Sequence, residues 1–221
     1  MRKIVLLHTV RSVYETFEHS LREYLPFEVE IHNMVDEFLA NGPALNNGTF
    51  TKNDYTRLVY DMLSAQSAHP DVIVVTCSSL TPYVTQLRSI ISTPIIAIDD
   101  EMCRQAVSLG SDICVLATAE STVKPTVSKI TEEAQKAGKD VNISSYCAPD
   151  AIVALKKGDV ETHDRLLLEL AKSKVKDFDV VVLSQASMAA MRENIEKEVS
   201  VQTLSSPLMC MKAVKEFLEN M

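Results

Sequence analysis

An internal repeat is the feature of this sequence that most constrains its fold. Segment 71–79 (DVIVVTCSS) aligns with segment 179–187 (DVVVLSQAS) at an offset of 108 residues. Two further pairs of segments keep this offset to within one residue: 4–9 with 113–118, and 102–107 with 209–214. Similar segments at one constant spacing indicate two copies of a single structural unit of roughly a hundred residues.

Each copy shows the alternation typical of an α/β fold. Short Val/Ile-rich runs alternate with longer amphipathic segments, which predicts βαβ units and a parallel sheet. Strands are predicted near 3–8, 28–33, 71–76, 94–98, 112–117, 140–146, 179–184 and 200–204. Helices are predicted near 12–24, 53–68, 80–91, 99–109, 121–137, 159–175, 187–197 and 206–219. We therefore expect lobe 1 to span 1–98, with the C-terminal helix 206–221 packing back on it, and lobe 2 to span 99–205.

Several predicted boundaries have a chemical reason. Asn53 or Asp54 can cap the helix near 53–68, Gly110 and Gly138 can end helices, and Pro207 suits a first helical turn. Residues 41–48 are expected to form an irregular loop, which is either a lid or a tolerated insertion.

Composition and charge exclude several classes of protein. The 221 residues carry a net charge of −8 without a basic patch, so nucleic acid is not an expected partner. No apolar run reaches the roughly 20 residues of a membrane span, and the N-terminus is predicted to be a core strand, not a secretory signal. The odd count of five cysteines without a CxxC pair indicates a reduced, cytoplasmic protein without a zinc site. A sequence with five glycines and no glycine-rich phosphate loop is not expected to bind a nucleotide cofactor.

The functional site is expected where the parallel strands end. Ligands of such sheets bind beyond the carboxyl ends of the strands, and two lobes can face each other there across a cleft. Four loops would line it: 8–12, 76–79, 117–122 and 184–187. Their hydroxyl groups and the backbone N–H groups of the following helices can hold an anion, although some of these hydroxyls can equally be helix caps.

Cys77 is the main candidate for a catalytic residue in these loops. It ends an apolar strand and directly precedes a predicted helix, a position that lowers the pKa of a thiol and favours the nucleophilic thiolate. The alternative is a buried, inert cysteine. We assign that alternative to Cys103, Cys114 and Cys210, which fall in the middle of apolar elements, and leave it open for Cys147.

At these loops the chain resembles the aspartate/glutamate/hydantoin racemase superfamily. Segment 72–79 resembles the family's first catalytic-cysteine strand, and 183–189 (LSQASMA) resembles its second. Segments 7–9 (LHT) and 116–122 (LATAEST) resemble its two first-strand loops. The resemblance implies two pseudo-symmetric parallel-sheet lobes of flavodoxin-like type, with the active site in the cleft between them. Because family members are often oligomers, it also favours a homo-oligomer.

The resemblance further implies chemistry without a cofactor at the carbon next to a carboxylate. Two opposed cysteines act there as acid and base on the two faces of that carbon. In this chain the second cysteine position holds Gln185, an amide that cannot exchange protons near neutral pH. The implied catalytic residues are Cys77 and Gln185 at the second-cysteine position. The return proton would come from another group, either water or His8, and a structural, hydrogen-bonded His8 is an equal alternative. The implied carboxylate-binding residues are Thr9, Arg11, Ser78, Ser79, Thr118, Ser121, Thr122, Ala186 and Ser187, while Arg11 can equally be an exposed loop residue.

Three functions remain open from the sequence. The first is an isomerase or racemase acting on a small carboxylate substrate with one catalytic cysteine. The second is a one-thiol lyase that resembles arylmalonate decarboxylase, whose first-lobe loop is similar to 77–83 (CSSLTPY) outside the cysteine. Maleate isomerase, another relative, uses its first-lobe cysteine as a nucleophile. The third is a protein that binds a small carboxylate without catalysis.

Overall fold

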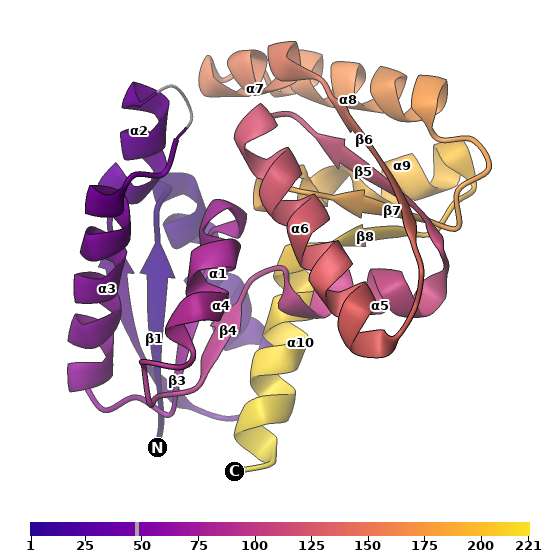
Figure 1. Ribbon diagram of the computed structural model, residues 1–221. Helices are drawn as coiled ribbons and strands as arrows, with labels where there is room; N and C mark the ends of the chain where they lie inside the picture. The colour runs from indigo at the N-terminus through magenta and orange to yellow at the C-terminus, as the bar shows by residue number, and fades with distance from the viewer. Residues whose placement is uncertain (47–48) are drawn as a thin grey trace. The chain divides into compact units, whose positions relative to one another are not determined.

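The computed structural model describes residues 1–46 and 49–221. The chain forms two compact units (Figure 1). Unit 1 consists of Met1–Ile98 together with Leu208–Met221, and unit 2 consists of Asp99–Pro207.

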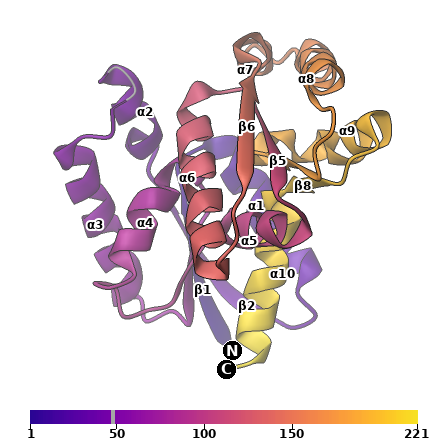
Figure 2. The same ribbon diagram turned by 45° about the vertical axis from the view of Figure 1, so that its right-hand side comes forward.

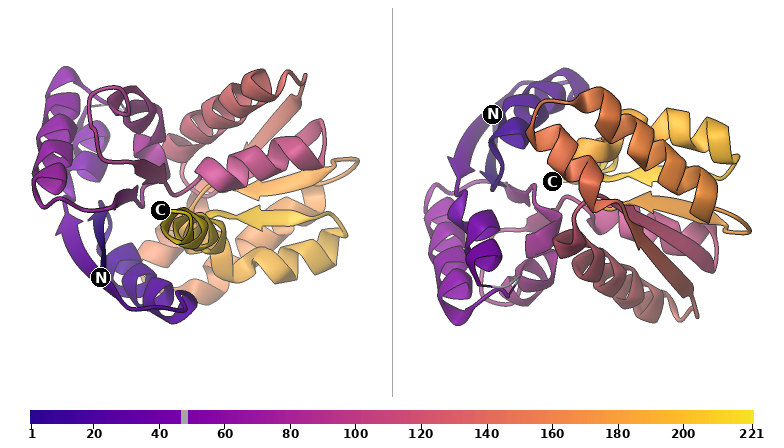
Figure 3. Two further views of the ribbon diagram at one scale, coloured as in Figure 1. Left: turned by 90° about the horizontal axis from the view of Figure 1, so that it is seen from below. Right: turned by 90° about the horizontal axis from the view of Figure 1, so that it is seen from above.

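Unit 1 is a four-stranded parallel sheet with helices on both faces. Its elements are β1 (Arg2–His8), α1 (Arg11–Tyr24), β2 (Val29–Val35), α2 (Phe38–Leu45), α3 (Lys52–Ser67), β3 (Val72–Val75), the 3-10 helix η1 (Ser78–Leu80), α4 (Thr81–Leu87), β4 (Ile95–Ala97) and most of α10 (Ser206–Glu219). The strand order is β2-β1-β3-β4. Helices α3 and α4 pack on the face of the sheet that carries Val5 and Val75, and α1 lies on the opposite side (Figure 3).

Unit 2 repeats this architecture. Its elements are α5 (Asp100–Leu109), β5 (Asp112–Ala117), α6 (Glu120–Ala137), β6 (Asn142–Cys147), α7 (Pro149–Lys156), α8 (Val160–Lys174), β7 (Val180–Leu183), the 3-10 helix η2 (Ala186–Met191), α9 (Arg192–Val199) and β8 (Thr203–Ser205). The strand order β6-β5-β7-β8 matches that of unit 1. Helices α8 and α9 pack on one face of the sheet, and α6 lies on the other (Figure 2).

The central strands explain why both faces must be covered. All four residues of β3 and all four of β7 are 0% exposed. A strand with Val, Ile or Leu at every position buries both of its faces, which is typical of a parallel sheet between two helical layers. The predicted α/β class with two parallel sheets is thereby confirmed.

The predicted irregular loop 41–48 is wrong over most of its length. Residues 41–45 belong to α2, and Asn47 and Gly48 lie outside the described residues. Two interactions hold this helix despite Pro43: the side chain of Asp36 accepts a 3.0 Å hydrogen bond from the Phe38 N–H, and Leu39 is buried. That the segment acts as a lid stays a prediction.

Other boundaries differ in smaller ways. Helix α3 is capped by Thr51, not by Asn53 or Asp54; Asp54 completes a capping box by accepting a 2.7 Å hydrogen bond from the Thr51 N–H. The segments predicted as helices 80–91 and 187–197 each begin with a 3-10 turn. Helix α7 was not predicted, because its eight residues are too few for a helical repeat to stand out in the sequence.

The predicted glycine ends of helices are confirmed. Gly110 is the C-cap of α5, and Gly138 is the C-cap of α6 with φ 63°, a left-handed conformation that glycine adopts without steric cost. Across 1–46 and 49–221, helices that are both long and apolar enough to cross a membrane are absent.

Candidate functional site

The candidate site in unit 1 lies where β1 and β3 end side by side. These strands pair in parallel with Leu7 opposite Val75. The Thr76 N–H then donates a 3.0 Å hydrogen bond to the Leu7 carbonyl, which holds the loop after β3 against the loop after β1. Cys77 and Thr9 therefore belong to adjacent loops at the carboxyl edge of one sheet.

Cys77 takes this place for local reasons. It follows a fully buried strand, keeps an extended backbone (φ −125°, ψ 112°) and is the N-cap residue of η1. Its carbonyl accepts a 3.0 Å hydrogen bond from the Leu80 N–H. The side chain is half-buried against the core of unit 1, unlike Cys103 and Cys114, which are 0% exposed. Cys77 is therefore the accessible thiol at the edge of this sheet.

His8 is held tightly inside unit 1. It is 0% exposed, its Nδ1 lies 2.8 Å from Thr76 Oγ1, and its Nε2 lies 3.1 Å from Asn33 Oδ1. Burial lowers the pKa of His8 below its usual value, although the Asn33 hydrogen bond opposes this. These contacts favour the structural alternative, in which a neutral His8 positions the loop that carries Cys77.

The other predicted residues of unit 1 divide by burial. Ser78 is buried and Ser79 half-buried on η1. Thr9 is only 3% exposed, and its hydroxyl has no hydrogen-bond partner among the described residues. Arg11 is exposed and its Nε lies 3.0 Å from Glu15 Oε1, as expected of a surface arginine.

Unit 2 carries the corresponding loops, with Gln185 in place of the thiol. Gln185 is half-buried, and its Oε1 accepts three hydrogen bonds from the loop after β5. The donors are the Thr118 N–H (2.7 Å), the Thr118 hydroxyl (3.1 Å) and the Ala119 N–H (2.9 Å). The structure thus brings Gln185 and Thr118 together, as their predicted positions required.

The remaining predicted residues of unit 2 make no hydrogen bond to Gln185 that the structure records. The Thr122 hydroxyl is buried and lies 2.9 Å from both the Ala119 carbonyl and Ser184 Oγ, which makes it a structural link. Ser121 and Ser187 are exposed, and Ala186 is half-buried.

The thiols elsewhere in the chain are unsuited to nucleophilic chemistry. Burial raises the pKa of Cys114 to about 12 and that of Cys103 well above its usual value. Burial and the neighbouring Glu120 raise the pKa of Cys147 to about 12 as well. No disulfide joins any of the five cysteines, all of which the structure describes.

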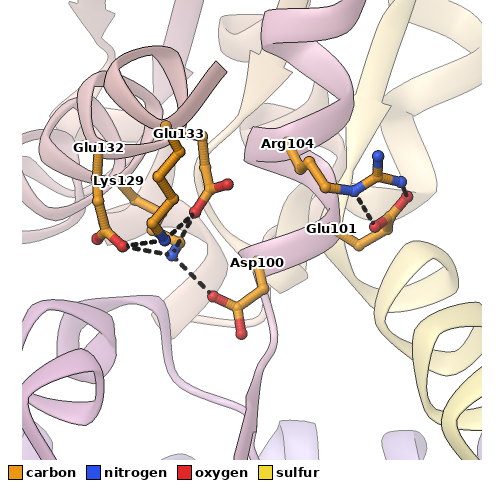
Figure 4. Close-up of polar contacts among 7 residues, drawn as sticks. Asp100, Glu101, Arg104, Lys129, Glu132 and Glu133 are labelled. Carbon is orange, nitrogen blue, oxygen red and sulfur yellow. Dashed lines mark hydrogen bonds and ion pairs between the residues drawn. The ribbon is translucent and has the colours of Figure 1, made fainter. Parts of the chain in front are cut away.

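One buried charge cluster was not predicted from the sequence. Lys129 on α6 is 3% exposed, and its Nζ lies 3.1 Å from Asp100 Oδ1 on α5 and 2.8 Å from Glu133 Oε1 (Figure 4). The sequence signal is Glu132 and Glu133 three and four residues after Lys129, which could not be told from a solvated helix face. Over residues 1–46 and 49–221, His, Cys, Asp and Glu side chains form no group of three or more suited to a metal ion.

Comparison with known proteins identifies the family. The model of the Asp/Glu/hydantoin racemase family matches residues 5–214. The chain belongs to this family.

Solved structures with the same fold include several family enzymes. A glutamate racemase from Bacillus anthracis is 17% identical with a TM-score of 0.77, covering 99% of this chain and 82% of its own. An allantoin racemase from Pseudomonas fluorescens is 17% identical with a TM-score of 0.68, covering 100% and 92%. A maleate cis-trans isomerase from Nocardia farcinica is 13% identical with a TM-score of 0.57, covering 99% and 93%. No curated protein matches the sequence.

Proposed function

We propose that this chain is a cofactor-independent isomerase or racemase that acts at the carbon next to the carboxylate of a small acid. Cys77 is its single catalytic thiol. The observation that carries the proposal is the pairing, on adjacent loops of unit 1, of an accessible thiol with a buried hydroxyl that has no hydrogen-bond partner among the described residues. A thiol and an oxygen-binding group at one edge are what proton abstraction next to a carboxylate requires.

In this proposal the loop after β1 binds the carboxylate and Cys77 acts on the neighbouring carbon. The Thr9 hydroxyl and the first backbone N–H groups of α1 donate to the carboxylate oxygens. The Cys77 thiolate removes the α-proton, leaving an enediolate whose charge the same donors stabilise. His8 contributes by orienting Thr76, the residue before Cys77, through the 2.8 Å Thr76 Oγ1–Nδ1 contact.

Gln185 favours one further candidate, a one-thiol lyase. An amide at the second-cysteine position does not transfer protons, so protonation from one face only is expected. In such a lyase the carbon–carboxylate bond breaks, carbon dioxide leaves, and the Cys77 thiol protonates the enediolate that remains. The structure of a maleate isomerase variant with a covalent succinylcysteine shows that a family-fold cysteine can also form a bond to carbon.

The test is incubation with amino acids, hydantoins and substituted malonates in heavy water, followed by NMR and chiral chromatography. We expect deuterium at the α-carbon of at least one substrate. Inversion with deuterium supports a racemase, whereas carbon dioxide release with a single product enantiomer supports the lyase.

Two variants make the experiment specific. Cys77→Ala should lower the exchange rate by about 10²–10⁴-fold, the usual contribution of a general acid or base. Cys147→Ala, at the other half-buried thiol, should leave it unchanged. Full exchange in Cys77→Ala, or none in the wild type with any substrate, would contradict the proposal.

A further inference from the structure

The two units hold two copies of the same loop pair, so each copy helps to interpret the other. The Thr76 N–H donates to the Leu7 carbonyl in unit 1, and the Ser184 N–H donates to the Leu116 carbonyl in unit 2, both at 3.0 Å. The bonds Leu80 N–H to Cys77 O and Met188 N–H to Gln185 O are also both 3.0 Å. Cys77 therefore matches Gln185, and Thr9 matches Thr118.

In unit 2 an oxygen already occupies the cradle that these loops form. We use "cradle" for the Thr118 N–H, the Thr118 hydroxyl and the Ala119 N–H, and for their counterparts Thr9 and Val10 in unit 1. The two backbone groups can only donate, so the Gln185 atom that they contact at 2.7 and 2.9 Å is the amide oxygen and not the nitrogen. Three donors on one oxygen are the arrangement that stabilises a carboxylate or an oxyanion.

In unit 1 the same cradle has no side-chain amide to fill it. Cys77 stands where Gln185 stands in unit 2, and its side chain carries no oxygen to place among the donors. Thr9 is only 3% exposed, and its buried hydroxyl has no hydrogen-bond partner among the described residues. A buried hydroxyl without a partner is unfavourable unless something else completes its hydrogen bonds, so it points to a ligand oxygen.

The two cradles also differ in the charge of the residue that follows them. The residue after the cradle is Arg11 in unit 1 and Glu120 in unit 2, each the first residue of its helix. Glu120 contributes to the raised pKa of Cys147 at the end of β6, so its negative charge acts at this edge of the sheet. Unit 2 therefore suits a neutral amide oxygen, whereas unit 1 has no carboxylate at the corresponding position.

We propose that unit 2 contains a second oxygen-binding cradle that Gln185 keeps filled, so that the chain binds one carboxylate, in unit 1. This rests on the proposed function for the reaction and narrows its substrate class to acids recognised through a single carboxylate. Gln185 is then a positioning residue that holds the loop after β5 through its amide oxygen.

The first test empties the cradle of unit 2 and refills it with a probe. Gln185→Ala removes the amide and should lower Tm by roughly 3–12 °C, the shift expected for the loss of its three hydrogen bonds in a chain of this length. Acetamide should then raise the Tm of Gln185→Ala saturably, and more than acetate does. Gln185→Met, which fills the space without an acceptor, is the matched control and should lose stability without rescue.

The second test compares the two equivalent threonines, Thr9 and Thr118, and does not depend on Gln185→Ala. Thr118→Val should lower Tm, because it removes a donor that has a partner. Thr9→Val should leave Tm unchanged or raise it. The same variant should abolish the binding of acetate to unit 1, as measured by NMR.

The outcomes decide the inference without any measurement of turnover. Equal rescue of Gln185→Ala and Gln185→Met, or equal losses of Tm in the two Thr→Val variants, would overturn it and leave the Cys77 chemistry untouched. Failure of the heavy-water experiment would in turn leave the filled cradle standing.

Discussion

Replacing Lys129 by methionine removes the cation from a buried cluster that joins α5 to α6. The lysine side chain is 2% exposed, and those of Asp100 and Glu133 are 23% and 13% exposed. Burial alone lowers the pKa of Lys129, but Asp100 and Glu133 outweigh it and raise that pKa above its usual value. The ammonium group therefore stays charged, and methionine would leave these carboxylates facing each other without it.

The magnitude follows from burial. Removing one partner of a buried ion pair costs about 3–5 kcal/mol. We expect the lower end, about 3 kcal/mol, because Glu133 also contacts Lys136 at 2.9 Å. For a chain of this length that corresponds to a decrease in Tm of roughly 6–12 °C.

The assay is urea unfolding of wild type and Lys129→Met between pH 4 and pH 7. Burial raises the pKa of Glu133, but the lysine contacts outweigh it and hold the pKa below its usual value of 4.5. A lowered carboxyl pKa stabilises the fold above the unfolded pKa, and this stability is lost as the pH falls through the folded pKa. The difference between wild type and variant should therefore shrink toward pH 4.

Lys136→Met is the matched control, because Lys136 contacts the same glutamates but its side chain is 56% exposed. It should cost only about 0–1 kcal/mol. Equal losses in the two variants, or a loss in Lys129→Met that does not depend on pH, would refute the reasoning.

Two further predictions concern unit 1. Burial and the neighbouring Asp36 raise the pKa of Asp61 to about 6. Wild type therefore loses stability as the pH rises from the unfolded pKa through 6, whereas Asp61→Asn does not. Between pH 4 and pH 7.5 the free energy of unfolding of Asp61→Asn should rise by about 1–2 kcal/mol relative to that of wild type, measured by urea unfolding. The same difference between the two proteins at both pH values would argue against this. Thr51→Ala removes the N-cap of α3 and should cost about 1 kcal/mol in the same assay, whereas Thr56→Ala, at an exposed position within the helix, should cost nothing; equal effects would show that the cap does not matter.

The sequence predicted the fold because the central strands of both sheets have an unambiguous apolar pattern. The runs 72–75 and 180–183 contain only Val, Ile and Leu, so they could only be buried central strands. The constant repeat offset then predicted the same order of elements in both halves. Gly138 marked a helix end because its left-handed backbone suits glycine, whereas at Gly110 a Cβ would clash with the Asp179 side chain.

Other features depended on tertiary contacts that no local pattern reveals. Segment 38–45 contains Gly42 and Pro43 and resembles a loop, yet Asp36 caps it and Leu39 anchors it in the core. His8 could be placed at the end of β1 but not recognised as fully buried, because its partners come from elsewhere: Asn33 from β2 and Thr76 from the loop after β3. The sequence likewise predicted Gln185 at the second-cysteine position, but its hydrogen bonds to the loop after β5 appear only in the folded unit.

The alkylation rate of each cysteine, followed by peptide mass spectrometry near neutral pH, tests most directly whether the chain holds one reactive thiol. We predict that iodoacetamide modifies Cys77 first and that Cys147, with its pKa raised to about 12, reacts much more slowly although both are half-buried. Modification of Cys77 no faster than that of Cys147 would contradict the account.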